Sequence, residues 1–170
     1  MVKGTKVEIS EALVEEAYAL GKERHLLCRR NGVHDNQQSG GSWYQVDGEG
    51  VCGEMAFATL VNADEEEWDR IREQTIQSAV GGTDTGDCKY KGYNFDVKTT
   101  KYATGHLILT QSKLDNLADA YALMVGFRGV YIFAGAISRE RILRDMDQFD
   151  TRSNGSVWIH QDHLQSIDHI

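Results

Sequence analysis

Asp96-Val97-Lys98 is the segment whose residue types and spacing suit chemistry best. In a β-strand, side chains two residues apart point the same way, so this carboxylate and this ammonium group would share one face. A carboxylate can hold a divalent cation, and an ammonium group can orient a water molecule or offset the charge that develops on a phosphate. The tripeptide is common by itself, so the elements around it decide its meaning.

The sequence predicts that this tripeptide closes a β-hairpin. Strand signals cover residues 87–90 and 93–99, and Lys91-Gly92 between them suits a two-residue turn because glycine accepts a positive φ. The register set by this turn places five apolar or aromatic side chains on one face, which we expect to be buried: Cys88, Tyr90, Tyr93, Phe95 and Val97.

The same register places Asp87 directly opposite Asp96, with Lys98 on their face. Opposed like charges about 5 Å apart destabilise a strand pair, unless a proton or a divalent cation lies between them. Asp84 is the alternative to Asp87, because a bulge near Gly86 would reverse which of the two faces Asp96.

Glu54 is the third carboxylate of the predicted site. Residues 51–61 predict a helix that is apolar almost all round and therefore buried, and Glu54 is its only charged residue. An unpaired buried carboxylate is unfavourable, so Glu54 should be protonated, paired with a Lys or Arg, or bound to a metal. The two aspartates that follow favour the metal, and an ordinary ion pair is the alternative.

The remaining elements predict a mixed α/β fold. Ser10 suits the N-cap of a helix that runs to about Arg30, residues 31–50 read as a loop, and Asp64 suits the N-cap of a helix whose first turn is acidic. Further strands are expected at 106–110, 120–125, 130–136 and 157–160, with a helix from Ser138 to Met146 and a short terminal helix. We expect one domain, residues 1–170, with an extension (1–50) and a core (51–170).

Composition excludes several classes of protein. The chain has 170 residues, 41% of them hydrophobic and 26% charged, which is typical of a globular domain. It has no run of about 20 apolar residues and no apolar stretch at its start, so we expect no membrane span and no signal peptide. Three widely spaced cysteines predict reduced thiols and a cytoplasmic protein. A net charge of −8 argues against nucleic-acid binding over the whole surface.

The order helix-Glu, Asp, Asp-x-Lys resembles the PD-(D/E)XK nuclease superfamily, particularly its compact bacteriophage members. The matching segments lie between about residue 50 and residue 170: Gly53-Glu54-Met55-Ala56-Phe57, Asp84-Thr85-Gly86-Asp87, Asp96-Val97-Lys98-Thr99-Thr100, Asp119-Ala120-Tyr121-Ala122-Leu123 and Gly135-Ala136-Ile137-Ser138-Arg139-Glu140. No proline precedes either aspartate, which departs from the pattern that gives the superfamily its name. The resemblance implies a restriction-endonuclease-like core, with a central mixed sheet flanked by helices and an antiparallel meander that carries the site.

The resemblance also implies Mg²⁺-dependent hydrolysis of DNA phosphodiester bonds, with Mn²⁺ as a substitute for Mg²⁺. Glu54, Asp87 (or Asp84), Asp96 and the Val97 carbonyl would hold the metal, and Lys98 would position the attacking water. Three lysines are candidates for phosphate contacts: Lys89, Lys101 and Lys113. Phage recombination, repair and host-DNA breakdown, in the host cytoplasm, are the processes that such an enzyme would serve.

Two other hypotheses stay open from the sequence. A nuclease-like scaffold could bind DNA or a protein partner without cutting, and the negative net charge favours a protein partner. Gly48-Glu49-Gly50-Val51-Cys52-Gly53 matches the G-x-G-x-x-G pattern of dinucleotide-binding proteins, but the charged, helix-capping stretch after it does not suit a βαβ unit, so we expect no nucleotide cofactor. Homodimerisation is left open, since endonucleases that cut both strands often dimerise.

Overall fold

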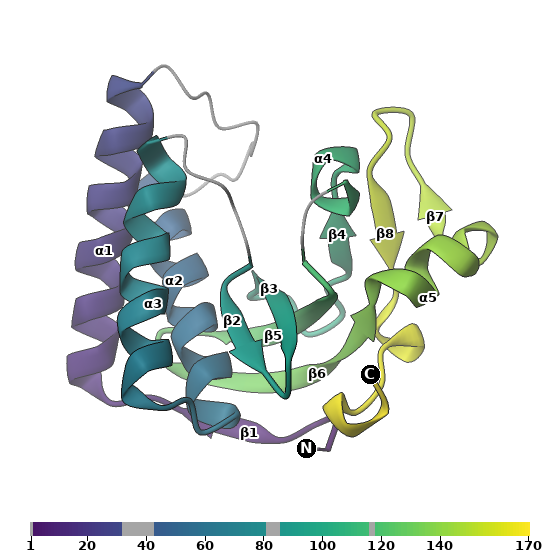
Figure 1. Cartoon of the computed structure of the whole chain (residues 1–170), viewed down its shortest axis with the longest axis horizontal. Coiled ribbons are helices and arrows are strands. Elements are labelled where there is room, and N and C mark those ends of the chain that lie inside the picture. The colour runs from purple at the N-terminus through teal and green to yellow at the C-terminus, as the bar shows by residue number, and fades with distance from the viewer. Residues whose placement is uncertain (1, 32–42, 81–85, 116–117) are drawn as a thin grey trace.

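A five-stranded mixed sheet forms the centre of the computed structural model, which describes residues 2–31, 43–80, 86–115 and 118–170. The strand order is β1-β6-β5-β3-β2, and β3 and β5 are the one parallel pair among these neighbours. The strands are β1 (Lys6–Glu8), β2 (Cys88–Tyr90), β3 (Tyr93–Thr100), β5 (Ala120–Phe127) and β6 (Val130–Ser138). Figure 1 shows that the long strands β5 and β6 curl as they cross the molecule.

Three helices cover one side of this sheet: α1 (Glu11–Arg30), α2 (Trp43–Leu60) and α3 (Glu65–Gln77) (Figure 1). The two predicted N-caps are confirmed, because the Ser10 hydroxyl accepts a hydrogen bond from Leu13 N–H at 3.3 Å and the Asp64 carboxylate accepts one from Glu67 N–H at 2.9 Å. The acidic run after Asp64 is therefore a helix start, as predicted.

The start of α2 was predicted wrongly. The helix begins at Trp43, so the loop expected over residues 31–50 is wrong for 43–50, and the expected boundary at residue 50 falls inside a helix. Residues 32–42 lie outside the described residues. The predicted burial of residues 51–61 is confirmed except at Thr59, which is partly buried, and the helix ends at Leu60. The apolar residues of this stretch form the main core with α1 and the sheet.

A second, three-stranded sheet lies on the other side of the molecule, in the order β4-β8-β7 (Figure 1). Its strands are β4 (Leu107–Leu109), β7 (Asp150–Thr151) and β8 (Val157–Ile159), with the short helices α4 (Gln111–Leu114) and α5 (Arg139–Arg144) nearby. The 3₁₀ turns are η1 (Ser78–Val80), η2 (Met146–Gln148), η3 (Gln161–His163) and η4 (Ile167–His169). A second apolar core fills the space between this sheet, α4, α5 and the main sheet.

The prediction of a three-stranded antiparallel meander, made of β2, β3 and β4, is wrong because β4 belongs to this second sheet. β4 pairs with β8 through Leu107↔Ile159 and Leu109↔Val157, and β3 pairs instead with β5, in parallel. A parallel pair needs a crossover connection, and β4 and α4 lie in the part of the chain that connects β3 to β5. The sheet carrying the predicted site is thus mixed, as expected, but only β2 and β3 form the predicted hairpin.

The hairpin has the predicted turn, and the predicted register is confirmed for the three residue pairs of its ladder but not for Asp87 and Asp96. Cys88↔Phe95, Lys89↔Asn94 and Tyr90↔Tyr93 are paired, and the turn residues Lys91 and Gly92 have φ values of 49° and 84°. Two consecutive positive φ values are the signature of the turn that matches the twist of a two-residue hairpin. Cys88, Phe95 and Val97 are buried in the main core, whereas Tyr93 is 40% exposed.

The structure therefore has a mixed α/β fold with a curled mixed sheet flanked by helices. All three cysteines are free thiols, as expected. Among the described helices, none combines the length and the apolar character that crossing a bilayer requires.

Candidate functional site

Asp96 and Lys98 lie on one face of β3, as their spacing predicts. The Lys98 ammonium group contacts one carboxylate oxygen of Asp96, and the Lys113 ammonium group lies 3.0 Å from the other. Burial by itself would raise the pKa of Asp96, but the two ammonium groups outweigh it and hold that pKa below its ordinary value of 3.8. The Asp96 side chain is 3% exposed, so it is a buried carboxylate with two cationic partners.

Asp87 takes a different position from the one predicted. Its N–H donates to Phe95 O at 2.7 Å, and Cys88 also pairs with Phe95, so the ladder ends before Asp87 can face Asp96. Gly86, at φ 95°, turns the chain at this point. The Asp87 carboxylate instead accepts a hydrogen bond from Val97 N–H at 2.6 Å, in the middle of the Asp-x-Lys tripeptide.

The electrostatics of Asp87 connect the three predicted carboxylates. Burial, and then the charges of Glu54 and Asp96, raise the pKa of Asp87 well above 3.8, while Lys98 and the Val97 N–H offset part of this effect. The direction is opposite to that of Asp96, whose lysine partners favour the ionised form. Acids from α2, from the chain entering β2 and from β3 therefore act on one another beside Lys98. Asp84, the alternative to Asp87, lies outside the described residues.

Glu54 forms an ion pair with an arginine, which was the alternative to metal binding in the sequence analysis. It is 7% exposed, and its Oε1 lies 3.3 Å from Nη1 of Arg24, a residue of α1. Nη2 of the same guanidinium lies 3.3 Å from both Asp47 Oδ1 and the Asp47 carbonyl oxygen. His25 Nδ1 lies 2.9 Å from the other oxygen of Asp47. Arg24, His25 and Asp47 thus extend the candidate site towards α1.

Sequence reasoning missed these three residues. Helix α2 carries Asp47, Glu49 and Glu54 and no basic residue, so each acid has to find a partner on another element. The sequence predicts a loop over residues 31–50, and this prediction hides the signal from Asp47 and Glu49. Glu49 finds its partners in the Tyr18 and Tyr131 hydroxyls, which donate to its carboxylate, and in the backbone N–H of Arg128.

The donor chemistry of the site fits a divalent cation in part. Carboxylate oxygens are the ligands that Mg²⁺ prefers, and Asp87 is a buried acid whose ionised form is opposed by two neighbouring carboxylates. Across residues 2–31, 43–80, 86–115 and 118–170, however, no three His, Cys, Asp or Glu side chains are grouped closely enough to hold a metal ion. Cationic side chains contact Glu54 and Asp96 instead, so a metal would have to replace some of these contacts.

The three lysines proposed for phosphate contacts have separate positions. Lys113, on α4, joins the site through Asp96, and the Tyr121 hydroxyl holds its backbone by donating to Lys113 O at 2.6 Å. Lys101 follows β3 directly and is exposed, with its ammonium group 5.4 Å from the centre of the Tyr102 ring. Lys89 is exposed on β2 and lines a groove of about 790 Å³ along α3, and five other residues that line this groove are acidic: Asp64, Glu66, Glu67, Asp69 and Glu73.

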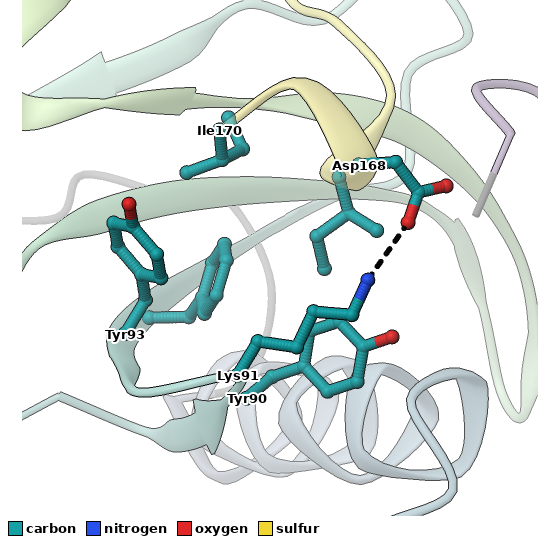
Figure 2. A pocket seen from close by; sticks show the side chains of 7 residues that line it. Tyr90, Lys91, Tyr93, Asp168 and Ile170 are labelled. Carbon is teal, nitrogen blue, oxygen red and sulfur yellow. Dashed lines mark hydrogen bonds and ion pairs between the residues drawn. The ribbon is translucent and has the colours of Figure 1, made fainter.

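A smaller hollow of about 70 Å³ lies at the turn end of the hairpin. Figure 2 shows Tyr90, Lys91 and Tyr93 on one side of it and Asp168 and Ile170 on the other, with Lys91 Nζ 3.1 Å from Asp168 Oδ1. Ligand pockets usually measure about 300–1,000 Å³, so this hollow is too small for a substrate. Neither hollow is lined by Glu54, Asp87 or Asp96.

The G-x-G-x-x-G pattern serves helix packing. Gly48, Gly50 and Gly53 all lie inside α2 rather than in a turn between a strand and a helix. A Cβ on Gly48 would lie 2.7 Å from the Tyr18 ring, one on Gly50 would lie 3.2 Å from Arg24, and one on Gly53 would lie 1.8 Å from the Thr99 hydroxyl. Each glycine therefore allows a side chain of another element to pack closely against α2, and the pattern does not form a dinucleotide site.

Comparison with known proteins places the chain in a family. The chain belongs to a family of unknown function, DUF5843, whose model matches residues 2–132. The match includes Arg24, Glu54, Asp87, Asp96, Lys98 and Lys113, and it ends inside β6. No curated protein and no solved structure matches the chain, so the nuclease resemblance rests on the residues alone.

Proposed function

We propose that this chain is a Mg²⁺-dependent nuclease that hydrolyses phosphodiester bonds of DNA, with a restriction-endonuclease-like core. The observation that carries the proposal is the position of the Asp87 carboxylate, which accepts a hydrogen bond from Val97 N–H, at the centre of the Asp-x-Lys tripeptide, at 2.6 Å and is subject to the charges of Glu54, Asp96 and Lys98. A carboxylate whose neighbours are two further carboxylates opposes folding, and such groups are typical of sites that bind or react.

The topology supports the same proposal. A helix that carries Glu54 precedes an antiparallel hairpin, and the second strand of this hairpin is parallel to a strand reached by a crossover. This arrangement is the part of the proposed core that positions acids from a helix and a hairpin at one place. The crossover also brings Lys113 to Asp96.

In the proposed reaction Lys98 has the central role among the residues of the chain. Its ammonium group would position the attacking water and offset negative charge on the phosphorus oxygens. Asp96 holds Lys98 in place on β3, and Lys113 supplies a second positive charge that a phosphate can contact. Mg²⁺, or Mn²⁺ in its place, would be held by Glu54, Asp87, Asp96 and the Val97 carbonyl, and its chemistry would be to acidify and orient the water.

The test is cleavage of supercoiled plasmid, linear duplex and branched DNA with Mg²⁺, Mn²⁺ or EDTA. We expect cleavage that needs the divalent cation and that Lys98→Ala abolishes. Lys22→Ala, which removes an exposed lysine of α1, is the matched control and should cut like the unmodified chain. Circular dichroism would establish that each variant is folded. Unchanged cleavage by Lys98→Ala would show that Lys98 has no role in the mechanism. Absence of cleavage on every substrate would show that the chain is not a nuclease.

One observation favours a second candidate, a scaffold that binds DNA or a protein without cutting. Glu54 and Asp96 both have cationic partners, and the described residues contain no ready-made metal group. A scaffold would bind nucleic acid or a partner equally well in EDTA and would gain no thermal stability from Mn²⁺. A nuclease would be stabilised by Mn²⁺, so a thermal melt with and without the ion separates the two functions.

A further inference from the structure

The two edges of the five-stranded sheet differ in what covers them. At the β2 edge, side chains of α3 bond to the backbone: the Lys89 N–H donates to the Glu67 carboxylate. Arg70 Nη1 donates to Gly86 O nearby, at 3.4 Å. The other edge is β1, which runs along the lower margin of the molecule in Figure 1. An edge strand that nothing covers can pair with another strand through its free N–H and C=O groups.

The backbone groups of Lys6 and Glu8 point away from the sheet. β1 is antiparallel to β6, and just beyond its end the Ile9 N–H donates to Gly129 O at 2.9 Å. Hydrogen-bonded positions alternate along an antiparallel pair, so the backbone of Val7 bonds to β6 while the backbones of Lys6 and Glu8 face outwards. Within the described part of the chain, no group bonds to these outward N–H and C=O groups.

The side chains of this edge are complementary in charge to a second copy of themselves. Val7 is buried in the main core, so Lys6 and Glu8 lie on the opposite face of the sheet, where each side chain is 62% exposed and the two contact each other. If two copies of β1 lie antiparallel about a two-fold axis at Val7, Lys6 of each copy is opposite Glu8 of the other. Each such pair joins opposite charges and exchanges two backbone hydrogen bonds.

Apolar side chains continue this face of the sheet behind β1. Ile132 of β6 lies opposite Lys6, and Val130 of β6 lies opposite Glu8. Phe127 of β5 lies opposite Val130, and these three apolar residues are 46–52% exposed. The aliphatic part of a lysine side chain packs on such a surface, so a second copy at the edge would cover part of it. An edge with lysines alone would repel a second copy, whereas this edge attracts one.

We propose that β1 is a homodimer interface, through which two copies of this chain join their five-stranded sheets edge to edge into one continuous sheet. Each copy contributes the three residues Lys6–Glu8 to the pairing, so the interface is small. Interfaces below about 1,200 Å² are typical of weak, transient complexes, and we expect a dimer that dissociates readily. No residue of the candidate site lies on β1, so this proposal is independent of the nuclease.

The test is sedimentation velocity of the full chain between about 10 μM and 1 mM, where the unmodified chain should be in equilibrium between monomer and dimer. Lys6→Glu and Glu8→Lys each place like charges at both symmetric pairs, and each should weaken dimerisation at least about tenfold. The two variants change the net charge in opposite directions, so net charge cannot explain a loss in both. Lys22→Glu, at an exposed position of α1, is the matched control and should dimerise like the unmodified chain.

Mixing the two single variants tests the antiparallel register. A Lys6→Glu chain and a Glu8→Lys chain have opposite charges at both pairs, so the mixture should form a heterodimer although neither variant dimerises well alone. The double variant Lys6→Glu/Glu8→Lys should regain the homodimer. Recovery in either experiment also shows that the single variants fold.

Three results would overturn the proposal. The first is an unmodified chain that stays monomeric at about 1 mM, which would leave the β1 edge to a strand of another protein. The second is dimerisation of both single variants at the unmodified affinity. The third is a mixture of the two single variants that associates no better than either variant alone.

Discussion

Replacing each of the two buried aspartates by asparagine should change stability in opposite directions. Asp96→Asn removes the carboxylate that two lysines contact, whereas Asp87→Asn removes a charge that Glu54 and Asp96 oppose. Asparagine has nearly the shape of aspartate, so packing is kept in both variants. At position 87 the amide oxygen can still accept the Val97 N–H.

The expected loss in Asp96→Asn follows from its contacts. Breaking a fully buried ion pair costs about 3–5 kcal/mol. The side chains of Lys98 and Lys113 are 30% and 28% exposed, so water can solvate the ammonium groups that remain, and the loss should be smaller. We expect about 2–3 kcal/mol, the scale of charge-assisted hydrogen bonds. For a domain of this size the melting temperature should fall by about 4–12 °C.

For Asp87→Asn we expect a gain of about 0.5–2 kcal/mol at pH 8, the usual size of a single stabilising substitution. The folded chain holds a proton on Asp87 above pH 3.8, so the contribution of Asp87 to stability decreases as pH rises from 3.8 through the raised pKa. Asp87→Asn lacks this decrease, and its advantage should grow with pH over that window. Asp96 acts in the opposite sense, because its contribution is present above 3.8 and is lost as pH falls through its lowered pKa.

The assay is thermal and urea unfolding of the three proteins between pH 3 and pH 9 with EDTA present. The unmodified chain should be more stable than Asp96→Asn at neutral pH, and this difference should shrink in acid. Destabilisation by Asp87→Asn at pH 8 would refute the claim that neighbouring carboxylates disfavour the charge of Asp87. An Asp96→Asn variant as stable as the unmodified chain would refute the claim that the two lysines stabilise the charge of Asp96. A gain from Asp87→Asn together with loss of cleavage would show that this acid is kept for chemistry at the expense of stability.

Three further substitutions test the contacts around the site, each by urea unfolding. Among the described residues, the Thr99 hydroxyl is buried without a hydrogen-bond partner, so Thr99→Val should be neutral or stabilising by up to about 1 kcal/mol, and clear destabilisation would reveal a missed partner. Gly53→Ala would place a Cβ 1.8 Å from that hydroxyl and should destabilise by about 1–3 kcal/mol, whereas an unchanged midpoint would mean that β3 shifts freely. Glu49→Gln weakens the acceptor for the Tyr131 hydroxyl and the Arg128 N–H and should cost about 1–3 kcal/mol, and a neutral result would mean that water replaces these bonds.

The features that the sequence predicted correctly depend on neighbours in the chain. Ser10 and Asp64 cap helices because their side chains bond to N–H groups three residues away. Lys91-Gly92 sets the hairpin register because the turn joins the two strands directly. The Asp96–Lys98 contact follows from the two-residue period of one strand.

The features that it missed depend on tertiary contacts. A strand signal at 107–109 does not say which strand it pairs with, and burial of Leu107 and Leu109 in the second core places β4 beside β8. Polar and glycine-rich residues at 43–50 have low helix propensity, so their helix forms because α1 packs on it. Arg24 and Glu54 are 30 residues apart in sequence and lie on two different helices, and no local pattern selects one arginine over another as the partner of Glu54.

The three glycines of α2 have a consequence for how the protein folds. Each glycine lowers intrinsic helix stability by about 1 kcal/mol relative to alanine, so residues 43–60 cut out as a peptide should be largely unstructured in water. Helix α2 therefore exists only while its neighbours dock against it, and Glu54 acquires its position at the same moment. Any event that loosens the contact between α1 and α2 would therefore melt this helix and displace Glu54, so the position of this buried carboxylate depends on the docking of the two helices.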